Sequence, residues 1–325
     1  MINELINVVL FTMLVFTTVA MVRIRSLFAI IMLSGIFSLL SANIFIFLDA
    51  VDVAFTEAAV GAGISTVLML ATLGITGQEQ KKRAQGSAIV PLIVVVITGA
   101  VLIYGTLDMP AVGDPLAPAH KHVAPRYIID SPTEIGIPNM VTSVLASYRG
   151  YDTMGEVIVV FTALIGVLSL IGIREQALPP NYSEPPPRPI LQVMAKFMVP
   201  FIVLFALYVQ FHGDFGPGGG FQAGVIFAVA IILYSLTFSQ YDGMRLVPPV
   251  LLKRLAALGV LIYGSVGIWT MLEGGAFLNY SVLASDAVAG QHLGILIIEF
   301  GVGLTVAAVM MLLFFAFISR GNKNP

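Results

Sequence analysis

The sequence predicts an all-α polytopic membrane protein with about nine transmembrane helices. Of the 325 residues, 58% are hydrophobic and only 10% are charged, and the mean hydropathy is +0.96. A soluble domain carries roughly 25% charged residues, so these charges are too few to cover a water-facing surface. Apolar runs of roughly 17–26 residues recur along the chain, and runs of that length cross a bilayer as helices.

Composition also excludes several classes of function. The chain has no cysteine, which rules out disulfides, thiolate metal sites and cysteine-held iron–sulfur clusters. Its formal net charge of −2 gives no electrostatic basis for binding nucleic acid. We therefore expect no cofactor or metal centre in this chain, so that any redox centre would belong to a partner.

Charged residues and clusters of glycine and proline divide the apolar runs into nine candidate spans. The first run lacks a preceding basic region and is followed at once by a second, so we interpret it as a span and not as a signal peptide. The predicted spans are Ile6–Val22, Leu27–Leu48, Val53–Ile75, Ile89–Leu107, Met154–Ile173, Phe197–Phe211, Gly219–Phe238, Leu255–Leu272 and Leu293–Ile318.

The basic residues predict the orientation, because cytoplasmic loops retain lysine and arginine. All but three of the 16 basic residues fall in alternate loops, and the exceptions are Lys121, Arg126 and Arg149. This asymmetry places the N-terminus outside and the C-terminus in the cytoplasm, which requires an odd number of spans. The residues on the predicted cytoplasmic side are Arg23, Arg25, Lys81, Lys82, Arg83, Arg174, Arg188, Lys196, Arg245, Lys253, Arg254, Arg320 and Lys323.

Two segments between the spans have a distinct character. Within the outer loop, Asn139–Tyr148 alternates apolar and polar positions with a helical period, which predicts a short helix lying in the interface. The cytoplasmic stretch Pro179–Pro189 is too rich in proline to form a helix. These features divide the chain into residues 1–107 with three to four spans, 108–178 with the outer loop and fifth span, the linker 179–189, and 190–325 with four spans.

Glu57 is an ionisable residue one turn into the third span. A charged side chain at a helix centre costs roughly 2.5–3.5 kcal/mol on insertion scales, so its presence needs a reason. One interpretation is a carboxylate that stabilises the positive N-terminal end of its own helix. The other is a proton or cation relay, with Gly61 and Gly63 leaving space for water and favouring a bulge in the helix.

Glu156 lies near the start of the fifth span, just inside Arg149 and Asp152. These residues form either an ion-pair cluster that anchors the helix end or part of a proton relay. Asp152 precedes Glu156 by one helical turn and shares its face. Two carboxylates in that position repel each other when both are ionised, which raises the pKa of one of them.

The entrance to the seventh span contains a dense glycine run that must interrupt the helix. Pro217 and Gly218–Gly220 form the interruption, and His212 and Asp214 flank it. Because backbone groups released at membrane depth need protein or water partners, we expect a broken helix beside a buried cavity, with a titratable histidine. Gly220 and Gly224 form a GxxxG pair at which another helix can approach closely.

Glu299 is the ionisable residue placed deepest in a predicted span. It follows His292 by two helical turns, roughly 10 Å along the axis. The same span has no lysine or arginine before its cytoplasmic end. Glu299 is therefore expected to be protonated, paired across helices or exposed to a water path.

Three of these motifs, in this order, resemble one known family. DVAFTEAAVGAGISTVLMLATLG and YRGYDTMGEVIVVFTALIGVLSL are similar to successive units near the C-terminal end of the large A subunit of Mrp-type multisubunit Na⁺/H⁺ antiporters. The first unit also resembles a small subunit of membrane-bound hydrogenases. HGDFGPGGGFQAGVI and the Glu299 helix resemble the antiporter's B subunit.

The resemblance implies the tail of A fused to B, without the long antiporter-like portion of A. It implies Glu57 and Glu156 as carboxylates of the ion path, and His212 with Gly218–Gly220 as the B-unit signature. The expected function is a non-autonomous subunit of a cation/proton antiporter in a bacterial or archaeal cytoplasmic membrane. Na⁺ and H⁺ would be the transported ions, the proton-motive force the driving force, and large antiporter-like chains and small membrane subunits the partners.

Two other functions stay open at this point. The same module could serve a membrane-bound hydrogenase or another redox complex resembling complex I, or it could be a structural scaffold between active subunits. Independent catalytic chemistry is not expected. Within the ion path we place Glu57, Glu156, Glu299, His212, Asp152 and Asp214, and in helix breaks and packing we place Gly61, Gly63, Pro217, Gly218, Gly219, Gly220 and Gly224.

Overall fold

The computed structural model describes residues 2–80, 89–111, 113–173 and 188–321. Within these ranges nine helical segments are long and apolar enough to cross a membrane, which confirms the predicted fold class. They are α1 (Ile2–Arg23), α2 (Leu27–Phe47), α3 (Val51–Glu57) continued by η1 (Ala58–Ile64) and α4 (Ser65–Thr76), α5 (Ile89–Thr106), α10 (Gly150–Leu170), α11 (Pro189–His212), α12 (Gly220–Thr237), α14 (Pro249–Leu272) and α15 (Ala287–Gly321).

Short helices occupy the loops between these spans. The loop between α5 and α10 contains a chain of them, and the connections before α14 and before α15 each contain one. The short helices are α6 (Pro118–Lys121), α7 (Val123–Ile129), α8 (Ser131–Glu134), α9 (Met140–Thr142), η2 (Ser143–Tyr148), α13 (Gln240–Leu246) and η3 (Tyr280–Val282).

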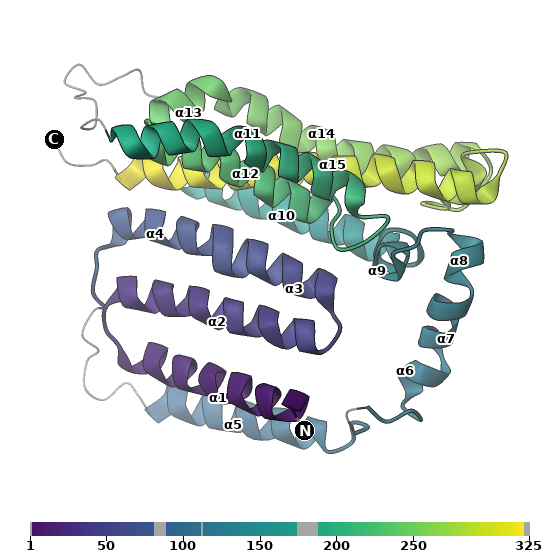
Figure 1. Ribbon diagram of the computed structural model, residues 1–325, viewed down its shortest axis with the longest axis horizontal. Helices are drawn as coiled ribbons and strands as arrows, with labels where there is room; N and C mark the ends of the chain where they lie inside the picture. The colour runs from purple at the N-terminus through teal and green to yellow at the C-terminus, as the bar shows by residue number, and fades with distance from the viewer. Residues whose placement is uncertain (1, 81–88, 112, 174–187, 322–325) are drawn as a thin grey trace.

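The helix α15 is the centre of the molecule. It is buried along most of its length and packs against α14, α12, α10 and α4. The helices α2 and α1 form a layer that extends away from this bundle, and α5 lies at the edge farthest from α15 in Figure 1. Every side chain of α5 is exposed, so its apolar surface is available to lipid or to another subunit.

Small residues bring α12 and α15 into backbone contact. A Cβ atom at Gly224 would lie 2.7 Å from the carbonyl oxygen of Gly303, and one at Gly220 would collide with the carbonyl oxygen of Glu299. Glycine at these positions therefore allows the close approach, which confirms the packing predicted for the GxxxG pair.

The predicted helix irregularities are also present. The segment Ala58–Ile64 is π-helical, which confirms the bulge expected around Gly61 and Gly63. The short helix expected at Asn139–Tyr148 is formed by α9 and η2, while its depth relative to the membrane remains a prediction.

Several helices extend beyond the predicted spans. The helix α11 begins at Pro189, before the predicted span that starts at Phe197, because proline suits the first position of a helix. The ammonium of Lys196 lies 5.4 Å from the ring centroid of Phe238, so this basic residue is accommodated within the helix. The rest of the predicted linker lies outside the described residues, as do Lys81, Lys82, Arg83, Arg174 and Lys323.

Candidate functional site

The glycine-rich turn between α11 and α12 folds back on the end of α11. Gly219 has φ +102°, a conformation that glycine adopts at little cost. Its N–H donates to the carbonyl oxygen of Val209 at 3.0 Å. A Cβ at Gly218 would lie 2.7 Å from the same oxygen. The helix interruption predicted at Pro217 and Gly218–Gly220 is therefore confirmed.

Glu299 places its carboxylate against this turn. A Cβ at Gly219 would lie 3.0 Å from Oε1 of Glu299, and a Cβ at Gly213 would lie 3.3 Å from Oε2. Residues without a side chain allow the carboxylate to approach both ends of the turn. The carboxylate also lies at the N-terminal end of α12, where the helix dipole favours a negative charge.

A cavity of about 520 Å³ opens beside Glu299 and gathers polar groups from four segments. Its lining includes Asp52 and Thr56 from α3, Glu156 from α10, Gln222 from α12, and the turn Gly218–Gly220. The structure thus brings Glu156 and Glu299 to one cavity although they lie far apart in the sequence. Carboxylates around a shared space can bind a cation or exchange protons.

Gln222 and Thr56 are polar residues of this cavity that sequence reasoning missed. The amide of Gln222 is 8% exposed and donates from Nε2 to the hydroxyl oxygen of Thr56 at 2.8 Å. This contact joins α12 to α3 across the cavity. In the sequence, the position of Gln222 between Gly220 and Gly224 was the available signal, since a polar side chain on a packed membrane helix needs a partner.

Four predicted ion-path residues are not among those that line this cavity: Glu57, His212, Asp152 and Asp214. Glu57 faces α2, because a side chain at Gly61 would collide with both the Glu57 carboxylate and the Ser38 hydroxyl. His212 stacks on the ring of Tyr208 at 4.9 Å between centroids. It lines a separate cavity of about 500 Å³ between α2, α3 and α11.

Asp152 is the third of these residues. Its Oδ2 lies 2.6 Å from a guanidinium nitrogen of Arg149, and both side chains are more than half exposed, at 54% and 55%. This is the anchoring ion pair that the sequence offered as one of two interpretations. Asp152 is not among the residues that line the cavity with Glu156.

Asp214 forms an ion pair with a histidine from a distant part of the chain. Its Oδ2 lies 3.7 Å from Nδ1 of His292, which is located near the start of α15. Burial raises the pKa of the Asp214 carboxyl, and the neighbouring His292 opposes part of that increase. The signal in the sequence was the spacing of His292 and Glu299, two turns apart on the same helix face.

Two buried tyrosines fix the start of α10, the helix that carries Glu156. The hydroxyl of Tyr263 donates to the carbonyl oxygen of Gly150 at 2.7 Å, and that of Tyr280 donates to the carbonyl oxygen of Ala146 at 3.1 Å. Both side chains are fully buried. Burial also raises the pKa of Tyr280 above its usual range, so its hydroxyl remains a donor.

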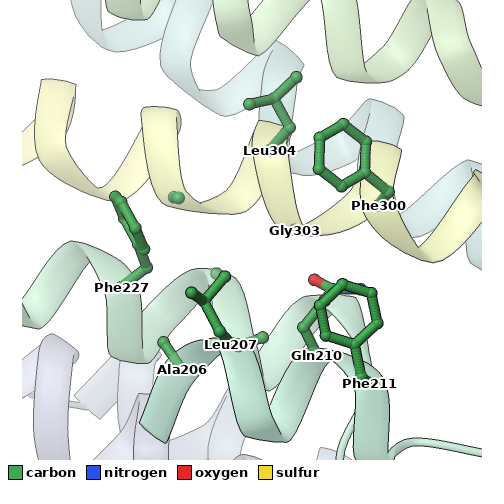
Figure 2. A pocket seen from close by; sticks show the side chains of 11 residues that line it. Ala206, Leu207, Gln210, Phe211, Phe227, Phe300, Gly303 and Leu304 are labelled. Carbon is green, nitrogen blue, oxygen red and sulfur yellow. The ribbon is translucent and has the colours of Figure 1, made fainter. Parts of the chain in front are cut away.

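A smaller cavity of about 160 Å³ lies beside the contact of α12 and α15. Its walls are apolar apart from Gln210, whose side-chain oxygen lies on the side of Gly303 in Figure 2. None of its lining residues is ionisable. We therefore assign it no part in the candidate ion site.

Comparison with known proteins identifies the family. Residues 190–312 match the family described as "Domain related to MnhB subunit of Na+/H+ antiporter", and residues 12–78 match the family of the D subunit of MBH. A putative antiporter subunit mnhB2 of Staphylococcus haemolyticus is 31% identical over 138 residues, which cover 42% of this chain and 96% of that protein. The chain belongs to the Mnh/Mrp family of antiporter subunits.

This Mrp-type subunit is also similar to proteins of other lengths. An uncharacterized protein of Methanocaldococcus jannaschii is 29% identical over 175 residues, covering 49% of the chain and 66% of that protein. A probable K(+)/H(+) antiporter A/B subunit of Rhizobium meliloti is 22% identical over 340 residues, covering 93% of the chain and 33% of that protein. The Mrp-type subunit thus spans about a third of the A/B relative, as the resemblance to an A-subunit tail joined to B implied.

Two solved structures resemble the Mrp-type subunit. The Mrp complex from Dietzia sp. DQ12-45-1b matches with a TM-score of 0.78 and 26% identity, over 97% of this chain and 35% of that chain. The membrane-bound sulfane sulfur reductase, an archaeal respiratory membrane complex, matches with a TM-score of 0.53 and 26% identity, over 69% of this chain and 97% of that chain.

The cavity of this Mrp-type subunit lies where the two matched segments meet. Asp52 and Thr56 belong to residues 12–78, and Gln222 and Glu299 belong to residues 190–312. Glu156 comes from the part of the chain between them. Each matched segment therefore supplies only part of the polar lining.

Proposed function

We propose that the chain is a non-autonomous membrane subunit of a multisubunit cation/proton antiporter driven by the proton-motive force. The cavity shared by Glu156 and Glu299 would be part of the ion path. The observation that carries this proposal is the convergence of carboxylates from separate family segments on one cavity. Other antiporter subunits would be the partners, and a bacterial or archaeal cytoplasmic membrane the location.

Carboxylates suit both ions of such an exchange. Oxygen ligands bind hard cations such as Na⁺, and a carboxylate can release the cation when it binds a proton. Glu299 and Glu156 would alternate between a protonated state and an ionised, cation-bound state. The polar pair Gln222 and Thr56 supplies further oxygen atoms at the same cavity.

The other predicted ion-path residues would act outside the cavity that Glu156 and Glu299 share. Glu57 and His212 lie on the α2 side of the broken helix, so they would serve a neighbouring branch of the path. Asp152 would hold Arg149 and the start of α10. Asp214 pairs with His292 and directly follows Gly213, which packs against the Glu299 carboxylate.

The test uses the complete complex in inverted membrane vesicles. We expect E299Q and E156Q to assemble at wild-type levels and to lose cation-dependent changes in the vesicle pH gradient, measured with Na⁺, K⁺ and Li⁺ separately. The matched control is E273Q, because Glu273 is an exposed loop residue that accepts a hydrogen bond from Trp269 at 3.2 Å. Wild-type exchange in both E299Q and E156Q would overturn the proposal and favour a scaffold role.

A second candidate function rests on the likeness to a respiratory complex. The match to the sulfane sulfur reductase covers nearly all of that chain, and residues 12–78 match the family of the D subunit of MBH. The same cavity could then couple ion movement to electron transfer in partner subunits. Mass spectrometry of the complex purified through this chain separates the two: iron–sulfur or nickel–iron subunits favour the redox complex, and antiporter-like chains without them favour the antiporter.

A further inference from the structure

An imidazole and a carboxylate form an ion pair beside the turn that packs against Glu299. His292 Nδ1 lies 3.7 Å from Asp214 Oδ2, with the two side chains 38% and 18% exposed. His292 is thus open to the surface, whereas Asp214 is directed further inside. An imidazole exchanges protons near neutral pH, so it suits a group that faces the outer solution.

The pair leads toward Glu299. His292 and Glu299 lie two turns apart on one face of α15, roughly 10 Å along the axis. Gly213, which directly precedes Asp214, packs against the Glu299 carboxylate. Asp214 therefore lies between the exposed imidazole and the inner carboxylate, in a position to pass protons between them.

The turn that carries Asp214 is held by the segment before α10. The backbone N–H of Asn139 donates to the carbonyl oxygen of Asp214 at 3.0 Å, and its side-chain amide donates to those of Gly213 at 3.1 Å and Gly216 at 2.9 Å. The hydroxyl of Thr142 donates to the Gly213 carbonyl at 2.7 Å. These bonds fix Asp214 relative to α15, and they come from residues outside both matched family segments.

Other ionisable groups at this end of the molecule have separate interactions. On α8, Glu134 pairs with Arg126 and accepts a hydrogen bond from Tyr148. On α3, Asp52 accepts a hydrogen bond from the Asn139 amide at 3.5 Å, and on α11 the ring of His212 stacks on Tyr208. The hydroxyl of Tyr280 on η3 donates to the carbonyl oxygen of Ala146. At the start of α15, the carboxylate of Asp286 accepts a hydrogen bond from the N–H of Ala289. Asp214 is the carboxylate in an ion pair with the His292 imidazole.

We propose that His292 and Asp214 form the external proton-exchange pair of the Glu299 cavity. The proposal rests on the proposed antiporter function and adds the residue at which protons enter. The neutral imidazole of His292 takes a proton from the outer solution, and the imidazolium passes it to the Asp214 carboxylate. Asp214 then passes the proton to the Glu299 carboxylate, which leaves His292 neutral and Asp214 ionised, so that one proton has moved inward.

The test measures cation efflux from right-side-out vesicles that contain the complete complex, at a series of external pH values. We expect H292Q to shift the activity profile by about one pH unit toward acid, an about tenfold loss of apparent proton affinity, because the remaining carboxyl binds protons only at lower pH. D214N should shift the profile in the same direction, because it removes the carboxylate that accepts the proton from His292. The double variant should shift no further than the larger single shift.

The matched control is H122Q, which makes the same replacement at an exposed histidine of the outer loop. Its profile should coincide with that of the wild type. An unshifted profile in H292Q, with E299Q inactive, would overturn the exchange pair and leave the proposed function intact. Active E299Q would count against the proposed function itself. If H292Q lowers the amount of assembled complex, D214N provides the same comparison.

Discussion

Replacing Gly220 by alanine tests the contact between α12 and α15 on which the position of Glu299 depends. The added Cβ would collide with the carbonyl oxygen of Glu299 and would lie 2.9 Å from its carbonyl carbon and 3.0 Å from the backbone nitrogen of Gly303. These are backbone atoms within a helix, so no side-chain rotation can relieve the overlap. The helices must separate, and overpacking of this kind destabilises a protein by about 1–3 kcal/mol.

The matched control is G264A on α14, where an added Cβ meets no atom within 4 Å. Alanine favours the helix over glycine by roughly 0.5–1 kcal/mol, so G264A should be neutral or slightly stabilising. Thermal unfolding of the purified complex measures both variants. We expect a lower midpoint for G220A only, with a parallel loss of exchange activity because the Glu299 backbone is displaced. Equal midpoints for G220A and G264A would refute the reasoning.

Two further predictions concern groups outside the cavity. Y263F and Y280F each leave a buried carbonyl without its donor and should each destabilise the protein by about 1–3 kcal/mol in the same unfolding assay, whereas Y104F, at a position that is 76% exposed, should not. The hydrogen bond from Tyr148, together with Arg126, holds the pKa of Glu134 below its usual 4.5. The stabilisation from ionised Glu134 is therefore fully present above pH 4.5 and lost as the pH falls through the lower folded-state pKa. Hydrogen exchange of the loop between α5 and α10 should show this loss in the wild type, and a loop that opens identically in E134Q would contradict it.

Residues close together in the chain allowed correct predictions. The π-helical segment around Gly61 and the interruption at Pro217 follow from glycine and proline, which act on their own backbone. The helix α11 begins before the predicted span at Phe197, because a run of apolar residues marks where a helix enters the membrane and not where its hydrogen bonds begin. Pro189 marks that start.

Contacts between residues that lie far apart in the sequence could not be predicted in the same way. The sequence placed His212 and Asp214 together beside the helix break, but α11 directs His212 toward Tyr208 and the cavity at α2. The histidine beside Asp214 comes from α15. Likewise Glu57 precedes two glycines that suit a water path, yet its carboxylate faces Ser38, since the rotation of α3 about its axis is set by packing against α2.

The number of spans, the helix breaks and the identity of the costly carboxylates follow from the amino-acid sequence, because run length, backbone freedom and desolvation are properties of single segments. Which carboxylates share a cavity is decided by the tertiary structure. Glu156 and Glu299 meet there because α10 packs against α15, while Gly220 and Gly224 let α12 lie against α15 and Gln222 bonds to Thr56 of α3. These contacts join residues from distant parts of the chain, and they depend on helix rotation and separation, which no local pattern specifies.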